Sequence, residues 1–162
     1  MAVLLGPAPA RGRILDVRCG YGVRARLLAV KSLGRKVVGI DTDEAAVRIA
    51  RAAARDELNV SFDRTDDLAG LDGTFDTILL VDCLDRTNAD AERTVALSAE
   101  RLAAAGNVIV RARVSGGGRK HVDRSEAEFE PILPRAGFSD VTERPDLTRN
   151  GECVWVLRRK PA

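Results

Sequence analysis

The strongest constraint on the fold is a regular alternation of short apolar runs with longer amphipathic segments. Strands that are separated by helices of such length pair in parallel through right-handed crossovers. Runs typical of strands cover residues 13–17, 36–40, 59–62, 75–81 and 107–113, and the continuously apolar runs in the last two fit a sheet that is covered on both faces. Helices are expected at residues 23–33, at 43–56 with Thr42 as the N-cap, at 88–104, and from a capping box of Ser125 and Glu128 toward Ala136.

The last two predicted strands, residues 138–142 and 153–158, are connected differently. A polar segment containing Asn150-Gly151 separates them, which suits an antiparallel hairpin and not a crossover. The sequence therefore predicts an α/β fold, a Rossmann-like doubly wound sheet of about seven strands, mostly parallel with an antiparallel C-terminal hairpin. We expect residues 1–12 to be a lead-in segment and residues 13–162 to form a single domain.

Composition limits the classes of protein to which the chain can belong. Lys and Arg number 26 and Asp and Glu number 24, and this net charge of +2 disfavours a strongly basic nucleic-acid arm. Aromatic residues make up 4%, which is too few for a surface that stacks on bases. No apolar run approaches the roughly 20 residues of a membrane helix. Cys19, Cys83 and Cys153 are widely spaced and accompany a single histidine, which disfavours disulfides or a metal site and favours a cytoplasmic protein.

Glycines and polar residues gather directly after the first four predicted strands. Because ligands of open α/β sheets bind at the carboxyl ends of the strands, these residues mark the predicted site. Asp16 opens a loop in which Gly20 and Gly22 allow a tight turn close to a ligand. Asp41 follows the second strand and can accept hydrogen bonds from two ribose hydroxyls. The polar residues after the third and fourth strands include Thr65, Asp66, Asp67, Asp82, Cys83 and Asp85.

Five sequence blocks occur in order over roughly residues 12–160: ILDVRCGYG, VVGIDTDEAAVRIAR, DDLAGLDGTFDTILLVDCL, RAGFSDV and VWVLRRKP. Together they resemble a small bacterial-type class I S-adenosylmethionine-dependent methyltransferase domain. The resemblance implies S-adenosylmethionine as the cofactor, a small molecule as the acceptor, and methyl transfer as the reaction. Such an in-line displacement depends mostly on positioning and desolvation.

The resemblance also implies roles for individual residues. Asp16 would orient the glycine loop and reach the methionine amino group, and Gly20 and Gly22 would face the methionine and the sugar. Asp41 would hold the ribose hydroxyls, and Asp66 would meet the adenine amine. The residues implied to bind the cofactor are Asp16, Arg18, Cys19, Gly20, Tyr21, Gly22, Asp41, Thr42, Thr65, Asp66, Asp67, Asp82 and Cys83.

Two residues are candidates for catalysis. His121 is the only histidine and belongs to a loop that we expect near the mouth of the site. Asp85 follows the fourth strand, where the family often has an aromatic residue or a histidine. A general base is optional for methyl transfer and depends on the nucleophile. His121 also has an ordinary interpretation as an exposed side chain of a loop.

Arg18 departs from the family pattern, because the first glycine of the family's loop belongs at this position. If the backbone there requires φ > 0, an arginine costs on the order of 1–2 kcal/mol. Its guanidinium would be repelled by a sulfonium, and it could pair with the cofactor's carboxylate or with Asp16. The sequence therefore leaves open a non-catalytic relative whose cofactor loop is damaged and which acts through a partner.

Other interpretations also stay open. Gly20, Gly22 and Ala25 fit a GxGxxA loop, and Asp41 has a suitable spacing for a ribose, as in a nicotinamide-dependent oxidoreductase. The two glycines could serve only the turn, and Asp41 and Asp82 could serve only as helix caps. Since few residues precede the first strand, we expect a site that is open or completed by another chain, for which a homodimer is one arrangement.

Overall fold

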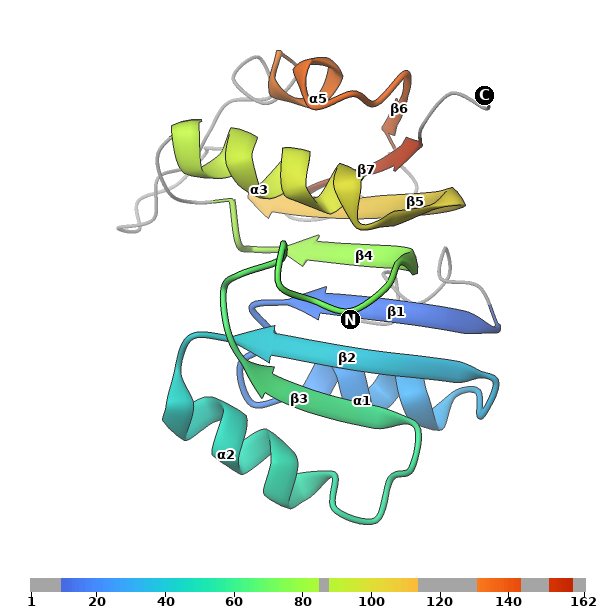
Figure 1. Ribbon diagram of the computed structural model, residues 1–162, viewed down its shortest axis with the longest axis vertical. Coiled ribbons are helices and arrows are strands. Elements are labelled where there is room, and N and C mark those ends of the chain that lie inside the picture. The colour runs from blue at the N-terminus through green and yellow to red at the C-terminus, as the bar shows by residue number, and fades with distance from the viewer. Residues whose placement is uncertain (1–9, 85–87, 114–130, 144–151, 159–162) are drawn as a thin grey trace.

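The computed structural model describes residues 10–84, 88–113, 131–143 and 152–158. These ranges contain the strands β1 (Gly12–Val17), β2 (Arg35–Asp41), β3 (Val60–Arg64), β4 (Phe75–Val81), β5 (Leu102–Arg113), β6 (Asp140–Glu143) and β7 (Glu152–Arg158). They form one sheet with the order β3-β2-β1-β4-β5-β7-β6 (Figure 1). The first five strands are parallel, whereas β7 is antiparallel to both β5 and β6. The predicted mostly parallel sheet and its C-terminal hairpin are confirmed.

Helices cover both faces of this sheet. The described ranges contain α1 (Val23–Val30), α2 (Glu44–Ala53), α3 (Asn88–Glu100) and α5 (Ile132–Arg135). Both α1 and α2 contact β2 and β3, whereas α3 contacts β5 and α5. In Figure 1, α3 lies in front of β5 and α1 lies behind β2 and β3. This arrangement leaves the carboxyl edge of the parallel strands available for a site.

Burial on both faces explains the continuous apolar run at residues 78–81 of the central strand β4. Ile78 and Leu80 belong to the core on the α3 face, and Leu79 and Val81 belong to the core that contains Leu28 of α1. Successive side chains of a strand point to opposite faces, so a strand covered on both faces must be continuously apolar. The four β4 side chains are each at most 3% exposed, as the sequence predicted for this run.

The boundary between α3 and β5 differs from the prediction. The helix ends at Glu100 instead of reaching residue 104, and β5 already begins at Leu102. Leu102 pairs with Phe75, and the register shifts before the pairing at Thr77. The alanine-rich stretch therefore joins the sheet through an irregular segment. Alanine is the strongest helix former, but intrinsic propensity is small beside tertiary interactions, and pairing with β4 overrides it.

The start of α2 also differs from the prediction. The N-cap is Asp43, whose side chain accepts hydrogen bonds from the backbone N–H groups of Ala45 at 2.9 Å and Ala46 at 3.2 Å. The prediction of Thr42 as the N-cap was wrong. A carboxylate at this position satisfies two backbone donors and also suits the positive end of the helix dipole.

Some predictions lie outside the described residues. These are the candidate catalytic residues Asp85 and His121, the capping box of Ser125 and Glu128, and the turn at Asn150-Gly151. Within the described ranges, no helix combines the length and the apolar character needed to cross a membrane.

Candidate functional site

The loop between β1 and α1 turns the chain sharply at the carboxyl edge of the sheet. Gly20 and Gly22 adopt φ angles of 55° and 74°, which glycine reaches without a steric penalty. A Cβ on Gly22 would lie 2.5 Å from Cζ of Phe62 and 2.9 Å from Cβ of Ala50. A Cβ on Gly20 would meet nothing within 4 Å in the described structure. Packing therefore requires Gly22, whereas Gly20 has open space beside its backbone.

Arg18 occupies the same loop with a φ of 54°. The backbone at Arg18 thus has the positive φ that was considered from the sequence. This left-handed conformation costs an L-residue on the order of 1–2 kcal/mol. The residue is exposed and lines the cleft at the carboxyl edge. Backbone strain of this kind is concentrated at functional sites, so Arg18 stands out as a candidate ligand contact.

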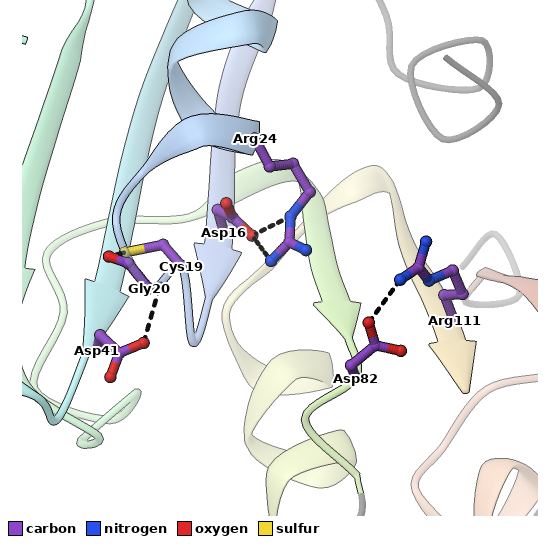
Figure 2. Close-up of polar contacts among 7 residues, drawn as sticks. All are labelled: Asp16, Cys19, Gly20, Arg24, Asp41, Asp82 and Arg111. Atoms are coloured by element: carbon purple, nitrogen blue, oxygen red, sulfur yellow. Dashed lines mark hydrogen bonds and ion pairs between the residues drawn. The ribbon is translucent and has the colours of Figure 1, made fainter. Parts of the chain in front are cut away.

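Asp41, the last residue of β2, connects the glycine loop to the start of α2. Its Oδ2 accepts a hydrogen bond from the backbone N–H of Gly20 at 2.8 Å (Figure 2). Its Oδ1 accepts one from the backbone N–H of Asp43 at 3.0 Å. A carboxylate oxygen has two lone pairs, so each can accept a further hydrogen bond. The backbone thus fixes the orientation of this carboxylate and leaves it acceptor capacity.

Asp16 lies in β1, fully buried, and pairs with Arg24 of α1. Its Oδ1 accepts hydrogen bonds from Nε of Arg24 at 2.8 Å and from Nη2 at 2.5 Å (Figure 2). Among the described residues, none donates a hydrogen bond to the buried Oδ2. Burial raises the pKa of Asp16, against the opposing effect of Arg24. A buried carboxylate with one unpartnered oxygen favours a further donor, especially a cationic one.

The thiol of Cys19 is not an activated nucleophile. Cys19 and Cys83 are both buried. Burial, followed by the charges of Asp16 and Asp41, raises the pKa of Cys19 to about 12. Because the reactive form of a thiol is the thiolate, Cys19 serves as a small core residue at neutral pH. The side chain of Cys153 lies outside the described residues.

The loop after β3 is shaped by its own polar side chains. The backbone N–H of Thr65 donates to the carbonyl of Asp41 at 3.0 Å, which brings this loop beside the end of β2. The N–H of Asp67 donates to Oγ1 of Thr65, and the N–H of Ala69 donates to Oδ1 of Asp67. Asp66 and Asp67 are both exposed. Asp67 therefore stabilises the loop, and Asp66 is presented at its surface.

Asp82 follows β4 and is the second non-glycine residue with positive φ, 53°, in the described ranges. Its carboxylate pairs with Arg111 of β5 (Figure 2). Its N–H donates to the carbonyl of Arg111 at 3.0 Å. Arg18 and Asp82 thus follow β1 and β4, the neighbouring strands at which the strand order reverses. Ligands of doubly wound sheets bind at such a switch point.

A cleft of about 260 Å³ opens at this edge. Its lining includes predicted residues from all four strand ends: Arg18, Asp41, Thr42, Thr65, Asp66, Asp67 and Cys83. The lining does not include six other predicted residues, namely Asp16, Cys19, Gly20, Tyr21, Gly22 and Asp82. Of these, Gly20 touches the cleft residue Asp41, and Tyr21 is 60% exposed.

Sequence reasoning missed the wall of the cleft that α3 supplies. Asp90, Arg93, Thr94 and Leu97 line it. Their spacing of three, four and seven residues places them on one face of a helix. That spacing is visible in the sequence, but only the strand order shows that this face lies beside the ends of β1 and β2.

Comparison with known proteins identifies the family. A family model described as a methyltransferase domain matches residues 14–106, more than half of the chain. The chain belongs to this family, and its fold is that of the class I S-adenosylmethionine-dependent methyltransferases. The "Putative methyltransferase YqeM" of Bacillus subtilis is 35% identical over 82 residues, which are 49% of this chain and 32% of that protein. The ribosomal protein L11 methyltransferase of Thermotoga neapolitana is 35% identical over 69 residues, which are 41% of this chain and 25% of that protein.

Solved structures agree on the fold. The S-adenosylmethionine-dependent methyltransferase SibL superposes with a TM-score of 0.82 and 21% identity, over 98% of this chain and 54% of SibL. The magnesium protoporphyrin IX methyltransferase ChlM from Synechocystis PCC 6803, with bound S-adenosylmethionine, has a TM-score of 0.75 and 23% identity, over 98% of this chain and 76% of ChlM. The chain thus spans about half of SibL and a third or less of the two curated relatives.

Proposed function

We propose that the chain binds S-adenosylmethionine in the strand-end cleft and transfers its methyl group to a small-molecule acceptor. The observation that carries the proposal is the placement of Asp41. The backbone N–H groups of Gly20 and Asp43 orient its carboxylate, and it lines the cleft at the end of β2. Two neighbouring ribose hydroxyls need an acceptor of this kind. Family membership supplies independent support.

The β3 side of the cleft suits an adenine. Ile40, Leu68 and Leu97 provide apolar surface there, and the exposed Asp66 can accept a hydrogen bond from the exocyclic amine. Thr65 ties this loop to the backbone of Asp41, so the adenine and ribose contacts are held in a fixed relation. An adenosine would therefore lie across the ends of β3 and β2.

The loop after β1 suits the amino-acid part of the cofactor. The buried, unpartnered Oδ2 of Asp16 favours a cationic donor such as an ammonium group. The open space beside Gly20 allows a ligand to approach the backbone. These two features support the presence of a charged, compact group next to β1, as the methionine head of the cofactor is.

Bound S-adenosylmethionine supplies an electrophilic methyl group, and the residues of the chain supply its position. Asp41 and the glycine loop fix the ligand in the cleft, and the apolar wall of Ile40, Leu68 and Leu97 excludes water from one side. Alignment and exclusion of water provide most of the catalysis for such a displacement. Asp85 and His121 are the candidates for accepting the proton of the nucleophile.

A small-molecule acceptor is favoured over a nucleic acid or a protein. The net charge of +2 and the 4% content of aromatic residues give little basis for binding a nucleic acid. Among the relatives, ChlM acts on a porphyrin, whereas the Thermotoga relative acts on a ribosomal protein and matches only over 69 residues. We further propose a cytoplasmic enzyme, with a second copy of the chain as one way to complete an open cleft.

Calorimetric titration with S-adenosylhomocysteine tests the proposal. The wild type is expected to bind with a Kd in the micromolar range, and Asp41→Ala is expected to lose binding. Asp56→Asn is the matched control, because Asp56 is exposed and follows the far end of α2. No saturable binding by the wild type would refute the proposal. Saturable binding of NADH instead would favour the oxidoreductase, and binding only by Arg18→Gly would favour the non-catalytic relative.

A further inference from the structure

Residues 65–74, the β3–β4 loop, connect two strands without forming a helix or a strand of their own. The loop runs on the same side of the sheet as α3 (Figure 1). Four of its residues line the cleft: Thr65, Asp66, Asp67 and Leu68. In the proposed function this loop presents Asp66 to the exocyclic amine of the adenine. Because ordering such a segment costs conformational entropy, contacts outside the cleft must fix its position.

Arg101, the residue between α3 and β5, holds the middle of this loop. Its Nη1 donates a hydrogen bond to the carbonyl of Leu71 at 3.1 Å, and its Nη2 donates one to the carbonyl of Ala69. Its own carbonyl accepts a hydrogen bond from the N–H of Phe75, the first residue of β4, at 2.9 Å. Hydrogen bonds from a charged donor are stronger than those between neutral groups. One residue thus fixes the loop at two positions and also the strand into which the loop leads.

Arg101 is also joined to the opposite wall of the cleft. Its N–H donates a hydrogen bond at 3.2 Å to the carbonyl of Leu97, which lines the cleft from the last turn of α3. Leu68 lines the cleft from the loop, and its carbonyl accepts a hydrogen bond from the N–H of Leu71 at 3.3 Å. Both cleft leucines pack in the core on the α3 face of the sheet. Arg101 therefore connects the two apolar walls of the cleft, although it does not line the cleft itself.

A second arginine contacts the end of the loop and not its middle. Nη1 of Arg13 donates a hydrogen bond to the carbonyl of Thr74 at 3.4 Å, and the guanidinium lies 4.7 Å from the ring centroid of Phe75. Arg13 belongs to the start of β1, whereas the cleft lies at the ends of the strands. The loop's own side chains hold its first residues. The position of the middle of the loop therefore depends on Arg101.

We propose that Arg101 is a positioning residue, which fixes the β3–β4 loop against α3 and thereby makes the cleft selective for an adenine base. The inference rests on the proposed function and adds to it a residue outside the cleft. The rigid fork of a guanidinium holds two carbonyls at a fixed spacing. A specific contact requires its groups to stay within about 0.5 Å of their working geometry. Without the fork, the two loop carbonyls turn to water, and Asp66 no longer stays where the amine can reach it.

The test compares S-adenosylhomocysteine with S-inosylhomocysteine, because these two ligands differ in the base, where a carbonyl oxygen replaces the exocyclic amine. Calorimetric titrations use the wild type, Arg101→Met, Arg101→Lys and the control Arg26→Met. Methionine keeps an apolar stem and removes every donor, whereas lysine keeps the charge without the planar fork. Arg26 is the matched control, because it also makes two hydrogen bonds, to Glu57, and does not line the cleft. Thermal unfolding verifies that each variant is folded.

The wild type and Arg26→Met are expected to bind S-adenosylhomocysteine about 10- to 100-fold more tightly than the inosyl ligand, as one hydrogen bond to a charged acceptor provides. In Arg101→Met this ratio should fall to within about threefold of unity, through loss of affinity for S-adenosylhomocysteine. Arg101→Lys should lie between. A general loss of stability would weaken the binding of both ligands alike and leave the ratio unchanged.

An unchanged ratio in Arg101→Met would overturn the inference, and so would an equal fall of the ratio in Arg26→Met. If Arg101→Met does not fold or binds neither ligand, the ratio in Arg101→Lys decides in the same way. Equal affinities of the wild type for the two ligands would also overturn the inference, while the proposed function would stand. A wild type that binds neither ligand would refute the proposed function, and this inference with it.

Discussion

Asp41 and Asp16 are carboxylates on neighbouring strands, and they are held in place in different ways. The backbone N–H groups of Gly20 and Asp43 hold Asp41, at the half-buried end of β2. A single side chain, Arg24, holds Asp16, which is fully buried in β1. Backbone donors are supplied by the fold itself, whereas an arginine can be lost in one substitution. The comparison shows that the β1 side of the cleft depends on ion pairs and the β2 side on local chain geometry.

The largest effect is expected on the β1 side, for Arg24→Met. This variant leaves a buried carboxylate without its partner, which should lower the free energy of unfolding by about 3–5 kcal/mol at pH 7. Burial raises the pKa of Asp16, so its folded form holds the proton more strongly than the unfolded form does. Its contribution to stability therefore falls as the pH rises above the ordinary carboxyl range. The loss in Arg24→Met should shrink toward pH 4.5, as measured by urea unfolding.

A double variant, Asp16→Asn with Arg24→Met, provides the control for that experiment. The double variant has no buried charge at this position, so it leaves no carboxylate without a partner. Its free energy of unfolding should therefore lack the pH dependence expected for Arg24→Met. Equal losses for Arg24→Met at pH 7 and pH 4.5 would show that the ion pair does not control the β1 side.

Asp41→Ala, on the β2 side, is expected to cause the second-largest loss of stability. The variant deprives the N–H groups of Gly20 and Asp43 of their acceptor and should lower the free energy of unfolding by about 1–3 kcal/mol. Urea unfolding measures this loss. Asp41→Asn keeps an acceptor oxygen and should lose less. A loss for Asp41→Asn as large as that for Asp41→Ala would show that the two N–H groups do not hold the β2 side.

Arg111→Met sharpens the comparison by testing an ion pair that is not buried. The side chain of Asp82 is 42% exposed and that of Arg111 is 19% exposed. A partly solvated pair contributes little, so the expected loss is about 1 kcal/mol or less, measured by urea unfolding at low salt. A loss as large as that of Arg24→Met would show that burial is not what separates the two pairs.

Arg18→Gly is expected to have the smallest effect on the free energy of unfolding, and it is the only one of these variants expected to raise it. Glycine relieves the positive-φ strain but also increases the entropy of the unfolded chain. The net gain in the free energy of unfolding should be about 0.5–1 kcal/mol, visible as a small rise in Tm. Arg24→Gly serves as a contrast, since Arg24 is helical and its loss must destabilise. A loss of stability in Arg18→Gly would mean that the arginine stabilises the loop.

The sequence predicted the sheet because hydrophobic periodicity and strand-end residues are local signals. The continuous apolar run of β4 and the antiparallel pairing of β6 with β7 both agree with the prediction. The prediction was less accurate where pairing between strands determines the local structure, as in the alanine-rich stretch at the start of β5. The prediction of Thr42 as N-cap was wrong because the choice depends on which side chain reaches the first turn of α2, and in the structure that side chain is Asp43.

The site was predicted in parts. The strand-end rule found Asp41 and the loop after β3, which the cleft brings together. The partners of the charged residues were not predictable, since Arg24 and Arg111 reach their acids only through the packing of α1 and the pairing of β5. The α3 wall was missed for the same reason.

The double engagement of Asp41 limits how this position can evolve. One carboxylate serves the turn before α1, the entry into α2 and, in the proposed function, the ligand, so a substitution must satisfy three demands together. Glutamate is longer by one methylene and would carry its oxygens past both N–H groups. A lineage that lost the ligand would therefore still be selected to keep the aspartate, and its presence alone would not reveal whether activity survives.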